Sequence, residues 1–420
     1  MQILALVLAG GMGQSLSVLT QPRAKPALPF AGKYRIIDFP LSNLVNSSLS
    51  RIAILIQYKA FSLIEHLGNG EPWGLYGQEQ NGLQIWQPSL ERTGSEKYLG
   101  TADAVYQNRK YISAAGSDTL LILSGDQIYK QDYRELLRFH QGKNADLTIA
   151  STQVPLDEAH RFGIMQVDSA ARITSFTEKP QQARDTLASM GIYVFKTDYL
   201  LRLLAADALN TASHHDFGRD IIPLVTQQDQ AYAFPFKGCW FDIGNVEAYW
   251  KKNLDLLQDP PPMILHDPDW VIHTRSAETH PLKVNSPGKI INSLVSDGCV
   301  IHGEVNNSVL SPGVRVEAGA IVRDSVIMND ALIHSGAVLE RVVLDKGVTI
   351  GANGRIGGGN DNSPNRDEPE ILQAGITVIG KRAITPDEVV IGRNCRIDMD
   401  AAPVDFEKMV ISSGATVHHR

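Results

Sequence analysis

Aliphatic residues recur about every six positions in the last third of the sequence, with glycine or asparagine nearby. The series consists of Ile321, Ile327, Ile333 and Leu339, followed by Leu344, Ile350 and Ile356. A triangular β-helix needs one inward aliphatic residue for each side of each coil, and small residues allow its corners to turn. The spacing therefore predicts a parallel β-helix, with an ordinary β-sandwich as the alternative.

A glycine-rich segment interrupts this pattern. Residues 357–364 read Gly-Gly-Gly-Asn-Asp-Asn-Ser-Pro, and this composition predicts an exposed loop. Residues 375–380 form an apolar run between two glycines. We therefore expect the β-helix to resume there.

The first 250 residues have a different pattern, in which short apolar runs alternate with helical segments. Strands are predicted at residues 3–8, 52–56, 119–123 and 147–151, and helices at 40–45, 102–112 and 133–141. Buried strands separated by helices favour an α/β domain with an open, mostly parallel sheet covered on both faces. Such sheets bind ligands at the carboxyl ends of their strands.

Proline marks the boundary between the two patterns. Pro260, Pro261 and Pro262 follow one another, and consecutive prolines fix φ and cannot continue a helix or a central strand. We therefore expect a first domain at residues 1–258, a linker at 259–290 and a repeat domain at 291–420.

Composition argues against several classes of protein. The 420 residues carry a formal charge of −7 without a basic run, so we expect no nucleic acid partner. Cys239, Cys299 and Cys395 are too widely separated to suggest a zinc motif or a disulfide framework. No apolar run reaches the roughly 18 residues of a membrane span, and no cation precedes the apolar N-terminus as in a signal peptide. We expect no membrane partner and a cytoplasmic location.

A glycine-rich turn follows the first predicted strand directly. It reads Leu8-Ala9-Gly10-Gly11-Met12-Gly13, and its glycines let backbone N–H groups approach an anionic ligand. Leu16 stands where a dinucleotide fingerprint has its third glycine, and a Walker motif is absent. The turn alone is therefore compatible with either a phosphate-binding loop or a plain strand-to-helix connection.

Cations behind this turn favour the phosphate-binding interpretation. Four of them, Arg23, Lys25, Lys33 and Arg35, lie within thirteen residues. Each can neutralise phosphate charge through charge-assisted hydrogen bonds, as a triphosphate requires. The alternative is a solvated basic loop.

Several further strings occur in a specific order and spacing. They are Gly100-Thr101-Ala102-Asp103-Ala104-Val105 with Gln107-Asn108, Ser124-Gly125-Asp126-Gln127-Ile128-Tyr129, Phe162-Gly163-Ile164-Met165, Glu178-Lys179-Pro180, Ala188-Ser189-Met190-Gly191-Ile192-Tyr193, His215-Asp216-Phe217-Gly218 and Trp240-Phe241-Asp242-Ile243-Gly244. With them, nearly the whole sequence resembles the bacterial ADP-glucose pyrophosphorylases, also called glucose-1-phosphate adenylyltransferases. The resemblance implies a mostly parallel, Rossmann-like nucleotidyltransferase domain followed by a left-handed parallel β-helix.

The same resemblance implies an activity. The family transfers the adenylyl group of ATP to glucose 1-phosphate with Mg²⁺, giving ADP-glucose for glycogen or another α-glucan. Members usually form tetramers, so we expect a homotetramer or a heterotetramer with a paralogous subunit. An anionic sugar-phosphate effector is also expected, and Lys33, Arg35 and Arg51 match the region that binds it, although a solvated basic face would have the same composition.

Site residues are carried over from the family position by position. Asp126 and Asp242 match its two magnesium-binding aspartates, and Asp126 also ends an apolar run, where a carboxylate can hold a hard cation or cap a turn. Lys25 and Arg23 join Asp126 as expected catalytic residues. The implied nucleotide-binding residues are Leu8, Ala9, Gly10, Gly11, Gly13, Gln57, Gly100 and Thr101. The implied glucose 1-phosphate residues are Tyr98, Gly163, Glu178, Lys179, Ser189, Asp216 and Trp240.

The sequence departs from the family at one site. Ser15 stands where the family has an arginine that contacts the triphosphate, Gln127 replaces a histidine, Lys97 a tryptophan and Phe241 an arginine. Two explanations follow: an enzyme that uses Arg23, Lys25 and other cations, or a catalytically weak regulatory subunit. Transfer to another sugar 1-phosphate is a further alternative, whereas a hexapeptide acyltransferase is disfavoured because His302 and His334 lack an evident partner.

Overall fold

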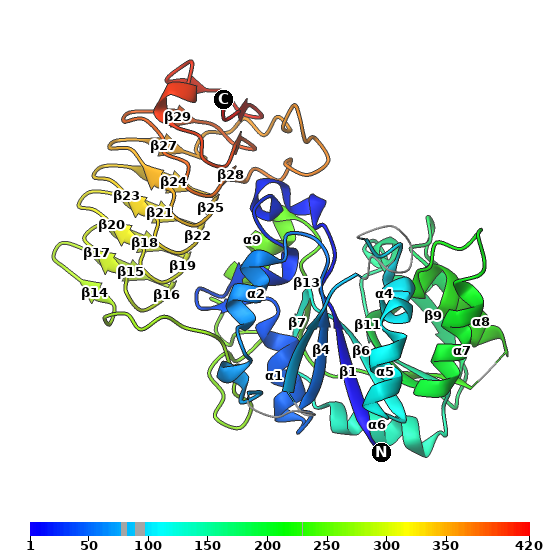
Figure 1. Ribbon diagram of the computed structural model, residues 1–420. Helices are drawn as coiled ribbons and strands as arrows, with labels where there is room; N and C mark the ends of the chain where they lie inside the picture. The colour runs from blue at the N-terminus through cyan, green and yellow to red at the C-terminus, as the bar shows by residue number, and fades with distance from the viewer. Residues whose placement is uncertain (77–81, 89–96, 229) are drawn as a thin grey trace.

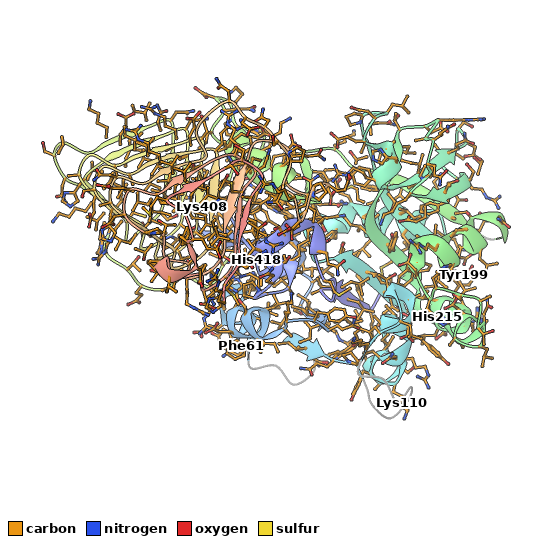
Figure 2. All side chains as sticks on the ribbon, turned by 90° about the horizontal axis from the view of Figure 1, so that it is seen from above. Phe61, Lys110, Tyr199, His215, Lys408 and His418 are labelled. Atoms are coloured by element: carbon orange, nitrogen blue, oxygen red, sulfur yellow. The ribbon has the colours of Figure 1, made fainter. Side chains whose placement is uncertain are left out.

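The computed structural model describes residues 1–76, 82–88, 97–228 and 230–420. It contains an N-terminal α/β domain and a C-terminal parallel β-helix (Figure 1). Seen from above, Lys408 and His418 belong to the β-helix, whereas Tyr199 and His215 lie on the far side of the first domain (Figure 2). The predicted fold class is confirmed.

The first domain is built on a sheet with the strand order β10-β9-β11-β6-β1-β4-β5, in which β8 also pairs with β11 and β12. Its strands are β1 Ile3–Leu8, β4 Arg51–Leu55, β5 Gly82–Trp86, β6 Thr119–Ser124, β8 Leu147–Gln153, β9 Gly163–Val167, β10 Ile173–Glu178, β11 Leu187–Lys196 and β12 Ala231–Pro235. Neighbours in the series β6-β1-β4-β5 run parallel, as predicted. However, β11 runs antiparallel to β6 and β8, and β9 and β10 form an antiparallel pair, so the whole sheet is mixed.

Helices cover both faces of the sheet. They are α1 Asp38–Asn46, α2 Phe61–Leu67, α4 Thr101–Gln107, α5 Arg109–Ala115, α6 Tyr133–Gly142, α7 Thr197–Asp207, α8 Ile222–Gln228 and α9 Val246–Asp255. Side chains of a strand point alternately to opposite faces. In β1, Leu4 and Leu6 therefore pack with the apolar residues of α4 and α7, whereas Ala5 and Val7 pack with those of α1 and α2. The near-continuous apolar run of β1 is explained by this burial on both faces.

Two short antiparallel pairs complete the first domain. They are β2 Pro29–Phe30 with β3 Tyr34–Arg35, and β7 Gln127–Tyr129 with β13 Trp240–Asp242. The second pair matters most for the site. It brings Asp242 opposite Gln127, next to the end of β6.

Three parallel sheets form the β-helix. Their strands are β14 Lys283–Val284, β17 Val300–Ile301, β20 Arg315–Val316, β23 Leu332–Ile333 and β26 Thr349–Ile350 in the first; β15 Lys289–Ile291, β18 Glu304–Asn306, β21 Ile321–Arg323, β24 Val338–Glu340, β27 Arg355–Ile356, β29 Val390–Ile391 and β31 Val410–Ile411 in the second; and β16 Leu294–Val295, β19 Val309–Leu310, β22 Val326–Ile327, β25 Val342–Leu344, β28 Thr377–Ile379, β30 Arg396–Ile397 and β32 Thr416–Val417 in the third. Because β14 and most of β15 precede residue 291, the β-helix begins inside the segment assigned above to the linker.

The repeat positions are buried, with one exception. Ile327, Ile333, Leu339 and the later members of the series lie in the β-helix core, but Ile321 is only half-buried. Its neighbour Val322 is fully buried and aligns with Leu339. The inward position of β21 is therefore one residue later than predicted, because adjacent side chains of a strand face opposite ways. The predicted loop at 357–364 lies between β27 and β28, and the β-helix resumes at β28 as expected.

The two domains share an apolar cluster. Leu16 and Leu28 from the first domain are fully buried there together with Val343 and Val378 from the β-helix. None of the helices in the described parts of the chain is long and apolar enough to cross a membrane.

A buried ion pair also crosses this interface. The Arg23 guanidinium donates to both carboxylate oxygens of Asp345, Nη1 to Oδ2 at 2.9 Å and Nη2 to Oδ1 at 2.8 Å. The side chains are 2% and 0% exposed. A bidentate geometry of this kind satisfies both partners, whereas removal of either one leaves a buried, unpaired charge.

We therefore expect Asp345→Ala to lower the free energy of unfolding by about 3–5 kcal/mol, measured by urea denaturation. The exposed pair Arg382–Asp400 provides the control, since Asp400→Ala should change stability little. The double variant Arg23→Met/Asp345→Leu should recover most of the loss, because no charge remains buried. Equal effects of Asp345→Ala and Asp400→Ala would contradict this account.

Candidate active site

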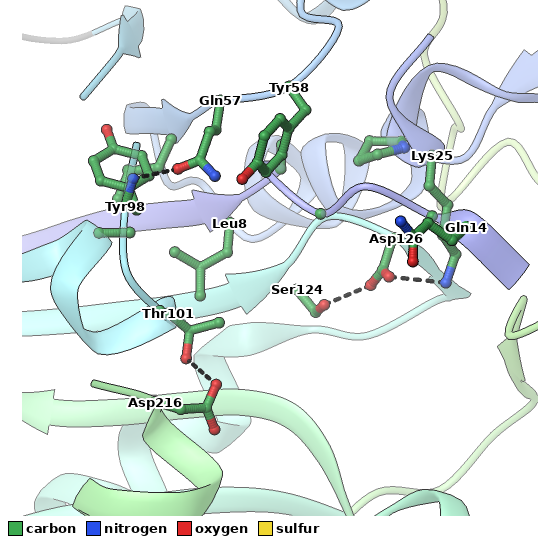
Figure 3. A pocket seen from close by; sticks show the side chains of 18 of the residues that line it. Leu8, Gln14, Lys25, Gln57, Tyr58, Tyr98, Thr101, Ser124, Asp126 and Asp216 are labelled. Carbon is green, nitrogen blue, oxygen red and sulfur yellow. Dashed lines mark hydrogen bonds and ion pairs between the residues drawn. The ribbon is translucent and has the colours of Figure 1, made fainter. Parts of the chain in front are cut away.

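Two cavities meet at the carboxyl ends of β1 and β6. The first has a volume of about 600 Å³ and the second of about 550 Å³. Both are lined by Leu8, Lys25, Thr101, Ser124, Asp126 and Asp216. Figure 3 shows Lys25 and Asp126 on one side of the pocket and Thr101 with Asp216 on another. The arrangement can hold two ligands in contact with one shared wall.

All residues predicted to bind nucleotide line the first cavity. They are Leu8, Ala9, Gly10, Gly11, Gly13, Gln57, Gly100 and Thr101. Glycine is required at two of these positions. Gly13 has φ +65°, and a Cβ on it would lie 3.1 Å from Thr20 Cγ2. A Cβ on Gly100 would lie 2.3 Å from the carbonyl oxygen of His215, so glycine permits the contact between these two loops.

Lys25 and Asp126 form the ion pair of the shared wall. Lys25 Nζ donates to Asp126 Oδ2 at 2.8 Å, and Ser124 Oγ donates to the other carboxylate oxygen at 2.5 Å. Burial alone would lower the pKa of Lys25, but the charges of Asp126 and Asp242 raise it above its ordinary value. Burial would raise the pKa of Asp126, but Lys25 and Ser124 hold it below the ordinary value. Both groups are therefore charged at neutral pH.

Asp242 lies at the end of β13 and faces the second cavity. Its Oδ2 accepts a hydrogen bond from Arg161 Nη2 at 2.5 Å. Burial raises the pKa of Asp242, Lys25 lowers it, and the nearby charge of Asp126 raises it further, with a net rise above the ordinary value. The mutual influence of Asp126 and Asp242 agrees with the pairing of β13 with β7, which directly follows Asp126.

These two carboxylates fit a site for Mg²⁺. Hard cations prefer oxygen donors, and Mg²⁺ commonly uses one or two carboxylates and takes its remaining ligands from substrate phosphates and water. Within the described residues there is no group of three histidine, cysteine or acidic side chains that could hold a metal. Asp126 and Asp242 would thus depend on a bound substrate to complete the coordination. Lys25 and Arg161 now occupy one oxygen of each carboxylate.

The second cavity contains most of the residues predicted to bind the sugar phosphate. Gly163, Glu178, Lys179, Ser189 and Asp216 line it. Lys179 follows the last residue of β10, and its Nζ lies 3.8 Å from Glu178 Oε1. Burial raises the pKa of Glu178 above its ordinary value, Lys179 opposes this effect, and the charge of Asp216 adds to it.

The Glu178 carboxylate fits between two glycines. A Cβ on Gly163 would lie 2.8 Å from Glu178 Oε2, and one on Gly218 would lie 2.5 Å from the same oxygen. Asp216 is fixed beside them, since Thr101 Oγ1 donates to its Oδ2 at 2.9 Å and the backbone N–H of Gly218 donates to its Oδ1 at 2.9 Å. Steric crowding by the Glu178 carboxylate therefore explains why both positions are glycine.

Tyr98 and Trp240 lie elsewhere than expected. Tyr98 lines the first cavity and not the second, and burial raises its pKa to about 12. Trp240 is not among the residues that line the second cavity; it packs on Phe162 at a ring-centroid distance of 5.1 Å. Trp240 and Asp242 are two residues apart on β13 and so point to the same face of the strand, where both line a neighbouring cavity, but only Asp242, at the end of the strand, also lines the second one.

Arg23 does not agree with the catalytic role predicted for it. It lines neither cavity, and its guanidinium is bound to Asp345 and to the carbonyl oxygen of Leu19. Of the described residues that line the first cavity, Lys25 is the only lysine or arginine. The sequence showed the charge of Arg23 but not its partner, which lies 322 residues away.

The three residues expected to bind an effector do not lie together. Lys33 and Arg35 line a third cavity, of about 350 Å³, between the first domain and the β-helix. Arg51 is not among its lining residues; it begins β4, at the opposite end of that strand from the cleft, and donates to the carbonyl oxygen of Ala115.

The departures from the family have distinct positions. Ser15 lines the first cavity and donates to the carbonyl oxygen of Gly244, which joins the glycine turn to the loop after Asp242. Gln127 accepts a hydrogen bond from Trp240 Nε1 at 3.2 Å. Phe241 is buried against Phe30, so its side chain does not face the cleft. Lys97 Nζ lies 5.8 Å from the centre of the Tyr58 ring.

Sequence reasoning missed two residues of the cleft. Arg161 binds Asp242, and Ser124 binds Asp126. Both stand at the edge of strings that the sequence contains, Arg161 directly before Phe162 and Ser124 directly after the apolar run of β6. An arginine in a short turn of helix and a serine at a strand end are common on protein surfaces, so neither position alone indicated a role.

The fold and the cleft define a class of protein. The family model described as nucleotidyl transferase matches residues 4–259, and the one described as GlmU-like, C-terminal hexapeptide matches residues 276–379. The chain is thus a nucleotidyltransferase with a hexapeptide-repeat domain.

Relatives specify the class further. A glucose-1-phosphate adenylyltransferase of Thermomicrobium roseum is 48% identical over 99% of this chain and 97% of its own. Those of Thermotoga neapolitana and Acetivibrio thermocellus are 44% and 41% identical, over 98% and 99% of this chain and 97% of theirs. The chain belongs to the glucose-1-phosphate adenylyltransferase family.

Gly218→Ala tests the packing around Glu178. The added methyl group would overlap the carboxylate, and a displacement of about 1 Å in a binding site can cost up to about a hundredfold. We expect the Kd for glucose 1-phosphate, measured by calorimetry, to rise at least tenfold, while nucleotide binding changes little. Gly142→Ala is the control, because nothing lies within 4 Å of its Cβ position. Unchanged sugar-phosphate binding in Gly218→Ala would contradict the assignment of Glu178 to this ligand.

Proposed function

We propose that this chain transfers the adenylyl group of ATP to glucose 1-phosphate, giving ADP-glucose and pyrophosphate. One observation carries the proposal: a glycine-lined cavity and a cavity with Glu178 and Lys179 meet at the Lys25–Asp126 pair. The first cavity suits a nucleotide, because the three glycines of the glycine turn and one lysine line it. The second suits a sugar phosphate, because a carboxylate for hydroxyl groups stands beside a lysine for the phosphate.

The chemistry is an in-line displacement. A phosphate oxygen of glucose 1-phosphate forms a bond to the α-phosphorus of ATP, and the bond from that phosphorus to the oxygen bridging to the β-phosphorus breaks. The electron pair leaves with pyrophosphate. The attacking phosphate is already ionised at neutral pH, so no general base is needed, and the chain's residues mainly align the two phosphates and neutralise their charge.

Lys25 has the central position for this task. Its raised pKa keeps it positive, and it lines both cavities. It can therefore contact the α-phosphate from the wall that both ligands share. Lys179, which also lines the second cavity, would contact the phosphate of the sugar. Asp126 and Asp242 would hold Mg²⁺, which when bound reduces the repulsion between the two phosphates.

The alternative of a regulatory subunit rests on Ser15. Relatives at 41–48% identity that carry the name of the enzyme favour the catalytic reading. The test is turnover of the purified chain alone with ATP, Mg²⁺ and glucose 1-phosphate, followed as pyrophosphate release. Replacement of ATP by GTP, UTP or dTTP, and of glucose 1-phosphate by other sugar 1-phosphates, tests the substrate assignment. Faster turnover with another nucleotide or sugar would overturn it.

Ser15→Arg should increase the rate. Because Lys25 is the only lysine or arginine among the described residues of the first cavity, the leaving pyrophosphate lacks a second cation there. One properly placed donor or cation contributes roughly a hundredfold or more to such reactions, so we expect kcat to rise at least tenfold. Ser15→Gln, which adds length without charge, is the matched control. No gain with arginine would show that charge at this position does not limit the reaction.

The third cavity is proposed as the site of an anionic effector. Its cations come from both domains: Lys33, Arg35 and Arg275 precede the β-helix, and Lys346 belongs to it. His66 and His266 also line it, and Asp297 is its one acidic residue among the described lining. Burial and then the charges of Arg35 and Arg23 lower the pKa of Lys346 to about 7. A bound anion would remove this repulsion between like charges.

This cavity should bind anions more tightly as the pH falls. Lys346 is mostly protonated at pH 6 and mostly neutral at pH 8. Sulfate, whose charge is constant in this range, should bind about tenfold more weakly at pH 8, which corresponds to about 1.4 kcal/mol. In Lys346→Met the dependence should largely disappear, whereas in His266→Asn it should persist. Calorimetric titration measures both, and a dependence that survives in Lys346→Met would assign it to another group.

Synthesis of glycogen or another α-glucan, tetramer formation and a cytoplasmic location stay predictions from the family resemblance and the sequence. The mass of the purified assembly in solution would test the second of them.

A further inference from the structure

The segment Gln14–Thr20 follows the glycine turn and lies against the β-helix. Leu16, Val18 and Leu19 are fully buried in the apolar cluster shared by the two domains. A Cβ on Gly380, just after β28, would lie 2.6 Å from Val18 Cγ2, so the β-helix backbone touches this segment. Both views show the blue N-terminal part of the chain beside the orange and red coils (Figures 1 and 2).

Ser17 has an unfavourable backbone conformation in the middle of this segment. Its φ is +52° and its ψ is −137°, a combination that glycine adopts readily and other residues rarely. Such a conformation persists only where surrounding contacts fix it. The contact here is specific: the buried Ser17 hydroxyl donates to Glu368 Oε2.

Glu368 is itself held in place from the β-helix. Its Oε1 accepts from Arg396 Nη1 at 2.6 Å, and its backbone N–H donates to Asn365 Oδ1 at 3.0 Å. Asn365 is fully buried and donates to the carbonyl oxygen of Asn394 at 3.0 Å. The carboxylate therefore has a fixed orientation before it meets Ser17.

The segment is also tied to the nucleotide cavity. The Thr20 hydroxyl and the Leu16 backbone N–H both donate to the carbonyl oxygen of Gly13, at 2.7 Å and 3.0 Å. Gly13, Gln14 and Ser15 line the first cavity. A change in the backbone conformation at Ser17 would therefore affect the glycine turn, which ends at the nearby Gly13.

We propose that Glu368 is a positioning residue for the nucleotide site: through its hydrogen bond it holds Ser17 in the conformation that presents the glycine turn to the cavity. The loop 357–376 of the β-helix is then part of the nucleotide-binding machinery, although Glu368 lines neither of the two cleft cavities. The inference rests on the proposed nucleotide site, and not on turnover.

The experiment compares Glu368→Ala in two backgrounds, the natural chain and Ser17→Gly. Because glycine adopts φ +52° unaided, the second background should no longer need the carboxylate. We expect Glu368→Ala to raise the Kd for ATP about tenfold in the natural chain and less than twofold in Ser17→Gly. The Kd for glucose 1-phosphate should stay constant in both. Calorimetry gives these constants without turnover.

Two further variants complete the design. Glu368→Gln retains an oxygen that can accept from Ser17 and should bind ATP nearly as well as the natural chain. Glu370→Ala, an exposed acid in the same loop, should change nothing. Equal losses of ATP affinity in both backgrounds, or parallel losses for both substrates, would show a merely structural role and overturn the proposal. If the natural chain bound no ATP at all, the proposed function would fail with it, whereas normal binding in every variant would refute the positioning role alone.

Discussion

The Lys25–Asp126 ion pair is the contact on which the cleft depends. It stands where the cavity lined by glycines meets the cavity lined by Glu178 and Lys179, and burial strengthens the attraction between its charges. Lys25 follows the glycine turn, and Asp126 lies just after β6, so the pair also joins the carboxyl end of that strand to the segment that leads into the domain interface. The pair thus links the wall shared by the two cavities to the domain interface.

The two aspartates of the cleft are each paired with a cation. Lys25 forms an ion pair with Asp126, and Arg161 forms one with Asp242. Each carboxylate thus has a cationic partner, which reduces the cost of placing two acids close together. Arg23, by contrast, is committed to Asp345, so its charge stabilises the domain interface.

The β-helix is in direct contact with the catalytic half of the protein. The apolar cluster around Leu16, the Arg23–Asp345 pair and the Ser17–Glu368 hydrogen bond all lie within ten residues of the glycine turn. The third cavity adjoins the same interface, since Lys346 directly follows Asp345. The third cavity and the cleft therefore have a short physical connection, through the segment from Gln14 to Lys25.

The sequence by itself determined the elements and most of the residues in the cleft. The apolar runs located β1, β4, β6 and β8, the six-residue period located the β-helix, and the strings around Asp126, Glu178 and Asp242 located the cavities. These features are local, because burial on both faces of a strand or at each side of a coil leaves a pattern in neighbouring residues. Only the tertiary structure decided that Arg23 turns to Asp345, that Trp240 packs on Phe162 and that Tyr98 lines the first cavity. It also decided that Arg161 binds Asp242 and that Glu368 contacts Ser17. Each of these depends on a partner distant in sequence, and a charge or an aromatic ring carries no local sign of the partner that the fold will bring to it.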